Sequence, residues 1–135
     1  MGLSSNGLKV YNSFMKLGLE GKVVLITGGS KGIGLACARM FAQEGALVSI
    51  ASRSQDNLDS ARQQLANEGI KVIAVQADFS QAKDAHAAVA ATEKQLGPID
   101  VLVNSAGAAK RRNLDAYDAE AWQEGMNAKY FPYVF

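Results

Sequence analysis

The stretch TGGSKGIG at residues 27–34 decides the fold, because it joins a run of β-branched residues to an apolar helical pattern. Residues 22–27 (KVVLIT) are typical of a buried strand, and residues 32–45 read as a helix that ends at a glycine. Glycines in the turn let the backbone fold tightly and approach a bound group closely. A helix N-terminus adds free N–H groups and partial positive charge, so the turn is predicted to bind a phosphate.

Outward from this turn, the chain alternates between strand and helix signals. Further strands are expected at residues 46–52, 71–77 and 99–103, with helices after them for which Ser54 and Ser80 serve as N-caps. The apolar stripes expected on these helices are Leu58, Ala61 and Leu65, then Ala85, Val89, Thr92 and Leu96, and finally Trp122, Met126 and Tyr130 on a helix that begins near Asp118.

Strict alternation of strands and helices implies parallel strands with helices on both faces. Right-handed crossovers then give the strand order 3-2-1-4. We therefore predict an α/β fold, a doubly wound parallel sheet of the Rossmann type that stops after about four strands and part of the following helix. Residues 19–135 form this partial domain. Residues 1–18 are predicted to be a disordered N-terminal extension, and the start is either Met1 or Met15.

Ser52 and Arg53 stand at the end of the second predicted strand, where an enzyme that uses NAD carries an acidic residue for the ribose hydroxyls. Ser52 has no charge to repel a phosphate, and the Arg53 guanidinium can grip a 2′-phosphate with two hydrogen bonds. Lys31 in the glycine loop adds a second positive charge. The pattern favours NADP over NAD, and the alternative is that both cations are solvated surface residues.

Two further loops follow predicted strands at the same edge of the sheet. A carboxylate in Asp78-Phe79 can accept a hydrogen bond from an adenine amino group, unless Asp78 only heads a loop before a Ser cap. The sequence NSAG at residues 104–107 closes the fourth strand with small residues that leave room for a cofactor. Asn104 can hydrogen-bond the neighbouring backbone and is expected to tie the strands together.

In this order, the four motifs resemble the classical short-chain dehydrogenase/reductase family from about residue 19 onward. TGGSKGIG is similar to the family's T-G-x-x-x-G-I-G loop, and NSAG to its N-N-A-G with one change. The resemblance implies an NADP-dependent oxidoreductase that transfers a hydride between nicotinamide and a small-molecule carbonyl or alcohol substrate, as a homo-oligomer when full-length. The residues implied to bind the cofactor are Gly28, Ser30, Lys31, Gly32, Ile33, Gly34, Ser52, Arg53, Asp78, Phe79, Asn104, Ala106 and Gly107.

The family's catalytic residues are a Ser, a Tyr and a Lys four positions after that Tyr, and the resemblance does not reach them. None of the 4 tyrosines is followed by Lys at that offset. The fourth family residue, an Asn in the last helix, has two candidates: Asn127 has the residue type, whereas Lys129 has the family's spacing from Trp122 and is favoured. We expect an N-terminal fragment that is inactive alone, and the alternative is a non-catalytic dinucleotide-binding module.

Composition and charge argue against several other classes. The chain has 135 residues and a formal net charge of +1, which favours neither nucleic acid nor membrane, and no apolar run approaches the ~20 residues of a spanning helix. The single Cys37 fits a reducing cytoplasm. No cluster has metal-ligand spacing, and His86 is expected to be solvated, as are Lys110, Arg111 and Arg112. A receiver-type signalling domain would need acidic residues where TGGS stands.

The carboxyl-terminal segment is expected to make the isolated chain poorly stable. The fourth strand would present unpaired N–H and C=O groups on one side, and such an edge pairs readily with other chains. Pro132 lies inside the last predicted helix, where an interior proline costs ~3 kcal/mol. The final residues, 130–135, are apolar or aromatic, so fraying would expose them and favour aggregation.

Overall fold

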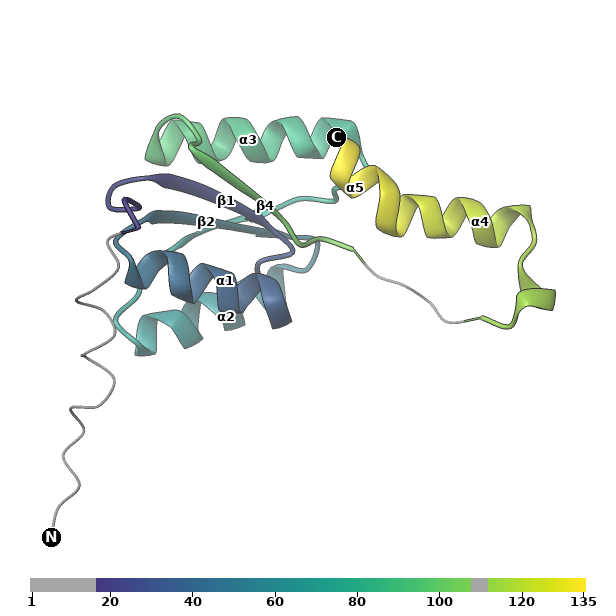
Figure 1. The fold of residues 1–135 in the computed structure, drawn as a ribbon, viewed down its shortest axis with the longest axis horizontal. Coiled ribbons are helices and arrows are strands. Elements are labelled where there is room, and N and C mark those ends of the chain that lie inside the picture. The colour runs from purple at the N-terminus through teal and green to yellow at the C-terminus, as the bar shows by residue number, and fades with distance from the viewer. Residues whose placement is uncertain (1–16, 108–111) are drawn as a thin grey trace, which may run out of the picture.

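Figure 1 shows a parallel sheet with helices on both of its faces. The computed structural model describes residues 17–107 and 112–135, so most of the expected extension at residues 1–18 lies outside the described residues. The strands are β1 (Val23–Thr27), β2 (Leu47–Ser52), β3 (Ile73–Gln76) and β4 (Val101–Asn104). Their order is β3-β2-β1-β4, which confirms the predicted topology.

Each face of the sheet packs against different helices, because side chains alternate along a strand. The helices are α1 (Gly32–Gln43) and α2 (Gln55–Asn67) on one face and α3 (Ala82–Leu96) on the other (Figure 1). In β1, Val24 and Ile26 belong to the core cluster beneath α1 and α2, whereas Leu25 belongs to the cluster beneath α3. This strand is therefore buried on both faces, as the unbroken apolar run predicts.

The predicted start and buried face of α2 are both confirmed. The Ser54 hydroxyl accepts a hydrogen bond from the Asn57 N–H at 3.3 Å, which is the expected N-cap. Leu58, Ala61 and Leu65 are all buried against the sheet.

The predicted start of α3 is wrong. Ser80 does not cap this helix, because its N–H and its hydroxyl both donate to Asp78 Oδ1, at 3.0 and 2.8 Å. Gln81 occupies the N-cap position instead, with no side-chain cap bond. The Ser80 hydroxyl donates to the Asp78 carboxylate because both residues lie in one tight turn, and it therefore does not cap α3.

The buried face of α3 also differs from the prediction. Ala85 and Thr92 are buried as expected, but Ala88 lies between them on the sheet side, and Val89 is 40% exposed. The helical period places Ala88 three residues from Ala85, so the contact face is rotated slightly toward small side chains. Thr92 is fully buried, and its hydroxyl shares a 2.8 Å hydrogen bond with Ser49 of β2.

The amino ends of β1 and β4 are joined by an ionic clamp. The Asp100 carboxylate accepts hydrogen bonds from the Val23 N–H and from Lys22 Nζ, each at 2.9 Å. These two bonds, the backbone one first, hold the pKa of Asp100 below its ordinary value. We refer to these three residues as the amino-end clamp.

The carboxyl-terminal residues form an arm (residues 119–134) that extends to one side of the sheet (Figure 1). A short 3₁₀ turn (Leu114–Ala116) precedes it, and the arm contains α4 (Ala119–Gly125), a π-helical turn (Met126–Tyr130) and α5 (Phe131–Val134). The start of α4 lies at the predicted place near Asp118, and the Asp118 side chain caps the helix, since it accepts from the Ala121 N–H at 2.8 Å.

Pro132 lies in the first turn of α5, directly after the π-helical turn, rather than inside a regular helix. The wider π-helical turn shifts the hydrogen-bond ladder just before it, since the Phe131 N–H bonds to the Met126 carbonyl five residues back, and a proline, which has no N–H, is accommodated at this irregular point. Pro132 is buried, whereas the stripe residues Trp122, Met126 and Tyr130 are 64%, 39% and 53% exposed. The arm therefore accommodates its proline but leaves its aromatic stripe on the surface.

Candidate functional site

A cleft of about 490 Å³ opens at the carboxyl edge of the sheet. It lies beside the switch between β1 and β4, the place where doubly wound sheets bind ligands. Its lining residues are Gly28, Ser30, Lys31, Gly32, Ile33, Ser52, Arg53, Asn57, Asp78, Phe79, Ser80, Ser105, Ala106, Gly107, Asn127, Ala128, Lys129 and Pro132. The structure thus brings together all the predicted cofactor residues except Gly34 and Asn104, which do not line the cleft.

Two glycines of the loop are required by the close packing of the loop against itself and against the turn after β4. A Cβ on Gly34 would lie 2.3 Å from the Gly28 carbonyl oxygen, so the first turn of α1 sits directly on the start of the loop. Gly28 has φ +68, and a Cβ there would lie 2.7 Å from the Ala106 nitrogen. These close approaches seat the glycine loop against both α1 and the turn after β4.

The N-terminus of α1 is free to receive an anion. Lys31 is at the N-cap position with no side-chain cap bond, and the first turn contains no acidic residue. The starts of α2 and α4, by contrast, are capped by Ser54 and Asp118. Free N–H groups, the helix dipole and the Lys31 ammonium all favour negative charge at this end of the cleft.

Thr27 ties β1 to the turn after β4, a role that we had predicted for Asn104. Thr27 is 3% exposed, and its Oγ1 accepts from the N–H groups of Ser105 at 3.2 Å and Ala106 at 3.1 Å. Asn104 is exposed, and its side chain makes no hydrogen bond within the described part of the chain. A hydroxyl residue at the last position of a buried strand was the signal that could have identified Thr27.

The end of β2 presents a hydroxyl and a guanidinium to the cleft. The Ser30 hydroxyl donates to the Ser52 hydroxyl at 3.0 Å, which links the glycine loop to the end of the strand. Arg53 follows on the exposed side, and Lys31 lies on the same cleft. Asp78 supplies the one carboxylate among the lining residues, against the three cations Lys31, Arg53 and Lys129, so the cleft is electropositive.

Asp78 is oriented by its own turn. Its Oδ1 accepts both bonds from Ser80, and its N–H donates to Asp84 Oδ2 at 3.0 Å. The alternative reading of Asp78, as the head of a loop, is therefore part of the structure. Its position on the cleft wall is also compatible with the predicted adenine contact.

The two candidates for the family's helix Asn both line the cleft but differ in their contacts. The Asn127 Oδ1 accepts from Gln123 Nε2 at 3.0 Å, along the arm. The Lys129 side chain lies over Gly107, where an added Cβ would be 3.4 Å from Nζ. The Lys129 Nζ is also 5.7 Å from the centre of the Tyr133 ring. Lys129 is thus the candidate that contacts the turn after β4.

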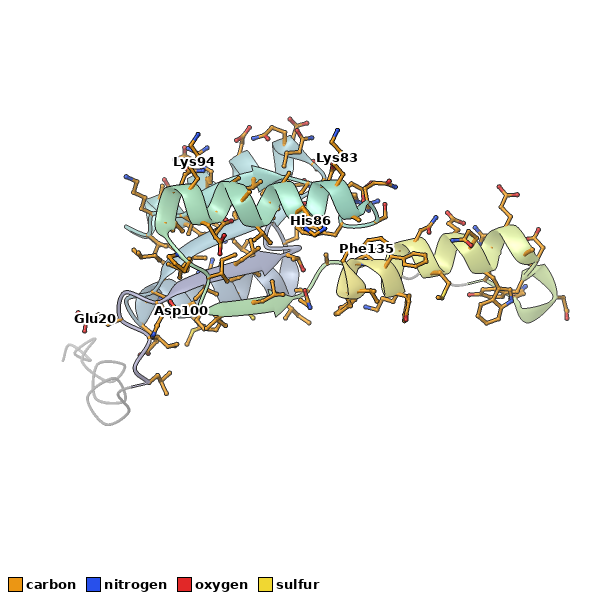
Figure 2. All side chains as sticks on the ribbon, turned by 90° about the horizontal axis from the view of Figure 1, so that it is seen from above. Glu20, Lys83, His86, Lys94, Asp100 and Phe135 are labelled. Atoms are coloured by element: carbon orange, nitrogen blue, oxygen red, sulfur yellow. The ribbon has the colours of Figure 1, made fainter. Side chains whose placement is uncertain are left out.

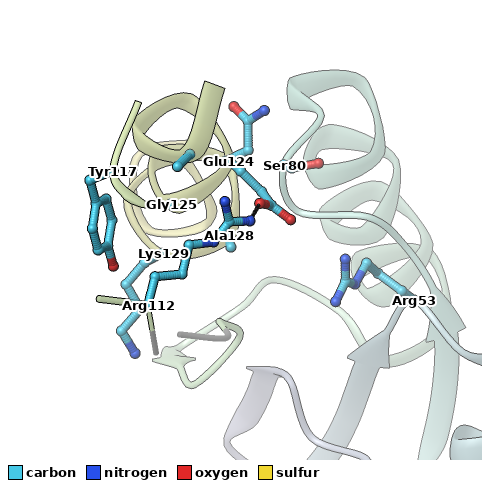
Figure 3. A pocket seen from close by; sticks show the side chains of 10 residues that line it. Arg53, Ser80, Arg112, Tyr117, Glu124, Gly125, Ala128 and Lys129 are labelled. Atoms are coloured by element: carbon cyan, nitrogen blue, oxygen red, sulfur yellow. Dashed lines mark hydrogen bonds and ion pairs between the residues drawn. The ribbon is translucent and has the colours of Figure 1, made fainter. Parts of the chain in front are cut away.

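A smaller hollow of about 320 Å³ lies between Arg53 and the arm (Figure 3). Figure 3 shows Arg53 on one side of it and Lys129 with the Arg112–Glu124 ion pair on the other. Arg112 is therefore paired rather than free in solvent, contrary to expectation. Lys110 and Arg111, the other two loop cations, lie outside the described residues.

The remaining titratable groups do not assemble a second centre within residues 17–107 and 112–135. No group of three or more His, Cys, Asp or Glu side chains in these ranges could hold a metal ion. His86 is exposed on α3, and Figure 2 shows Lys83 and Lys94 on the outer side of the same helix. None of the described helices is both long enough and apolar enough to cross a membrane.

Comparison with known sequences gives one family. Residues 22–135 match the family described as short chain dehydrogenase. Gluconate 5-dehydrogenase of Gluconobacter oxydans (strain 621H) is 37% identical over 117 residues, which are 84% of this chain and 46% of that protein. The 5-keto-D-gluconate 5-reductase of Escherichia coli (strain K12) is 35% identical over 106 residues, 78% of this chain and 42% of that protein.

Solved structures agree with the fold. The L-sorbose reductase from Gluconobacter frateurii, complexed with NADPH and L-sorbose, has a TM-score of 0.81 at 35% identity and covers 89% of this chain and 46% of its own. An NADPH-bound short chain oxidoreductase from Pseudomonas aeruginosa PAO1 with an atypical catalytic center has a TM-score of 0.79 at 32% identity, covering 84% of this chain and 45% of its own. The chain spans about half the length of these relatives.

Proposed function

Because the chain belongs to the short-chain dehydrogenase family, we propose that it is the NADP(H)-binding part of an oxidoreductase. The reaction of the whole protein is hydride exchange between nicotinamide and the carbonyl or alcohol group of a small molecule. One observation carries the proposal: the cleft at the carboxyl edge gathers the glycine loop, Ser52 and Arg53 around a surplus of positive charge. Nicotinamide supplies the hydride chemistry when the cofactor is bound. The residues described below would bind and orient the dinucleotide that carries it.

The preference for NADP(H) follows from the residues at the end of β2. A 2′-phosphate carries negative charge, and Arg53 can form charge-assisted bonds to it while Lys31 adds attraction from the loop. Ser52 places a neutral hydroxyl where a carboxylate would repel that phosphate. The structural neighbours that bind NADPH support the same choice.

The other lining residues have separate roles in the proposal. The uncapped N-terminus of α1 would hold the diphosphate, and the Asp78 carboxylate would accept from the adenine amino group. Ala106 and Gly107 leave space at the turn after β4. Lys129, which lies over Gly107, would occupy the family's helix-Asn position.

Proton transfer to the substrate oxygen has no donor pair in these 135 residues, since no Tyr is followed four positions later by Lys. We therefore expect the chain alone to bind NADP(H) without turnover, because general acid catalysis supplies orders of magnitude of rate. Because this pair of residues is absent from the sequence, a second candidate function is a dinucleotide-binding module without catalysis. Steady oxidation of NADPH with a panel of ketones by the purified chain would contradict both expectations.

The remaining attributes are proposed from the family. The whole protein would act on a small carbonyl or alcohol compound in the cytoplasm and assemble as a homo-oligomer, without nucleic acid or membrane as partner. Residues 19–135 would be its partial nucleotide-binding domain, with residues 1–18 as an extension. The relatives include a gluconate 5-dehydrogenase and a 5-keto-D-gluconate 5-reductase, so sugar acids are the first substrates to try.

Calorimetry with NADPH and NADH tests the cofactor choice. The unmodified chain should bind NADPH more tightly, and the double variant Ser52→Asp/Arg53→Ala should reverse the order, since each charge-assisted contact contributes ~1.5–3 kcal/mol. Arg62→Ala is the matched control, because it removes an exposed arginine of α2 that does not line the cleft. Equal affinities for the two cofactors in the unmodified chain would rule out the proposal.

A further inference from the structure

Two consecutive carbonyl groups at the end of β2 are held from the neighbouring strand. The Ser52 carbonyl oxygen accepts from the Ala77 N–H at 3.0 Å, which continues the β2–β3 ladder. The next carbonyl, that of Arg53, lies beyond the last residue of β2 and accepts instead from the side-chain amide of Gln76, with Nε2 at 2.9 Å. The Gln76 side chain thus adds one more hydrogen bond between the two segments, just beyond the last backbone bond of the β2–β3 ladder.

This arrangement fixes the direction in which the Arg53 side chain leaves the backbone. The α-carbon of Arg53 joins two planar peptide groups, and each plane is oriented by a hydrogen bond to its carbonyl oxygen. With both planes held, the two backbone dihedrals of Arg53 are held as well. The bond from its α-carbon to its β-carbon then points one way, which limits the region that the guanidinium can reach through its own side-chain torsions.

Gln76 itself has no contact with the cleft. It is exposed, it is absent from the cleft wall, and the hydrogen bond to Arg53 is the side-chain bond that it makes in the described chain. Neither core packing nor ligand contact therefore accounts for a donor at this place. The Gln76 side chain is long enough for its amide to reach the Arg53 carbonyl, and this hydrogen bond is the contact that the amide provides.

Resting on the proposed function, we propose that Gln76 is a positioning residue that sets the preference for NADP(H) through the backbone of Arg53. A bidentate contact requires the planar guanidinium to align with two phosphate oxygens. A guanidinium whose backbone is held in one orientation should therefore bind the 2′-phosphate more tightly than one whose backbone is free to rotate. NAD(H) lacks that phosphate and does not use this contact. Removal of the Gln76 amide should therefore weaken the binding of NADPH and spare that of NADH.

The test compares Gln76→Met with Gln63→Met in the full 135-residue chain by calorimetry with NADPH and NADH. Methionine keeps the length of glutamine but has no N–H donor. Gln63 is the matched control, an exposed glutamine on α2 whose amide donates to Asn67 at 3.0 Å. Loss of the alignment that the Gln76 amide imposes should weaken NADPH binding about three- to tenfold, the range of one well-formed hydrogen bond, and change NADH binding less than about twofold.

Two further readouts separate positioning from general damage. The carbonyl ¹³C resonance of Arg53 in the cofactor-free chain should shift in Gln76→Met and stay in place in Gln63→Met. The melting temperatures of the variants should match that of the unmodified chain, because both sites are exposed.

Each outcome has a distinct meaning. An unchanged ratio of NADPH to NADH affinity in Gln76→Met, in a chain that does prefer NADPH, would overturn this inference and leave the proposed function standing. Equal losses for both cofactors would overturn it too, since they indicate a merely structural role. An unmodified chain that binds neither cofactor, or both equally, would overturn the proposed function and the inference with it.

Discussion

The strand β2 and the carboxyl-terminal residues 130–135, with which the arm ends, are both mostly apolar in sequence, yet they differ in what surrounds them. Val48, Ile50 and Ala51 of β2 are at most 2% exposed, because strands flank them and helices cover both faces. Val134 and Phe135 at the end of the arm are 55% and 48% exposed. Apolar side chains thus occur in both places, and the arrangement of neighbouring elements decides which of them become core.

The arm is held mainly by contacts within its own segment. The rings of Phe131 and of Phe135, the residue after the arm, stack 5.3 Å apart, and those of Trp122 and of Tyr117, just before the arm, lie 5.4 Å apart. The helix pieces of the arm contact one another more than they contact the sheet. Its shape therefore depends on local helix formation, whereas the sheet depends on contacts between distant parts of the sequence.

The most direct test of this comparison is to remove apolar side-chain atoms from both regions. Ile50→Ala should lower the free energy of unfolding by about 2–5 kcal/mol, because it leaves a cavity in a fully buried site. Val134→Ala should change it by less than about 0.5 kcal/mol, because its side chain is already half exposed. Urea denaturation followed by circular dichroism measures both. Similar losses at the two sites would mean that the arm is packed as firmly as the sheet.

A pair of glycines tests the same contrast with the opposite change, an added methyl group. Gly34→Ala would push a Cβ into the Gly28 carbonyl, so we expect a loss of about 1–3 kcal/mol together with loss of NADPH binding. Gly125→Ala meets no atom within 4 Å and should stabilise the arm helix by about 1 kcal/mol. Thermal unfolding and calorimetry report the two effects. A Gly34→Ala chain that binds NADPH normally would refute the close-packed loop.

The amino-end clamp gives the smallest effect and makes it depend on pH. The pKa of Asp100 in the folded chain lies below its ordinary value of 3.8, so the folded state binds fewer protons than the unfolded state in this range. Its contribution is therefore present above about pH 4 and is lost as the pH falls through the folded pKa. Asp100→Asn should reduce the fall in unfolding free energy on acidification below about pH 4.

Asp115→Asn is the matched control for this effect, since Asp115 is exposed in the turn before the arm. Chemical denaturation at closely spaced pH values gives the curves. If Asp100→Asn and the unmodified chain lose the same unfolding free energy as the pH falls, the amino-end clamp does not contribute to stability.

The parts that were predictable from sequence are those governed by local pattern. The order of strands follows from alternation and handedness, and the cleft follows from the glycine loop and the loops after each strand. Ser54 was identified as a cap, and the start of the last helix was placed near Asp118, because such signals are local to one helix start. All of these inferences need only a few neighbouring residues.

The parts that could not be predicted depend on which partner a polar side chain contacts in the folded chain. Thr27 reaches the turn after β4, and Gln76 reaches the Arg53 carbonyl, across long stretches of sequence. Ser80 was expected to cap α3, but Asp78 competes for its hydroxyl within the folded turn. In each case a polar side chain had several possible partners, and tertiary geometry selected one.

The two ties between β1 and β4 have a consequence for which insertions and deletions the chain could tolerate. Asp100 holds the start of the pair and Thr27 its end, and the strands run in one register between them. One extra or missing residue inside either strand would let only one of the ties form at a time. This pair of strands should therefore accept substitutions on its surface far more readily than any change of length, so its length is constrained as strictly as its chemistry.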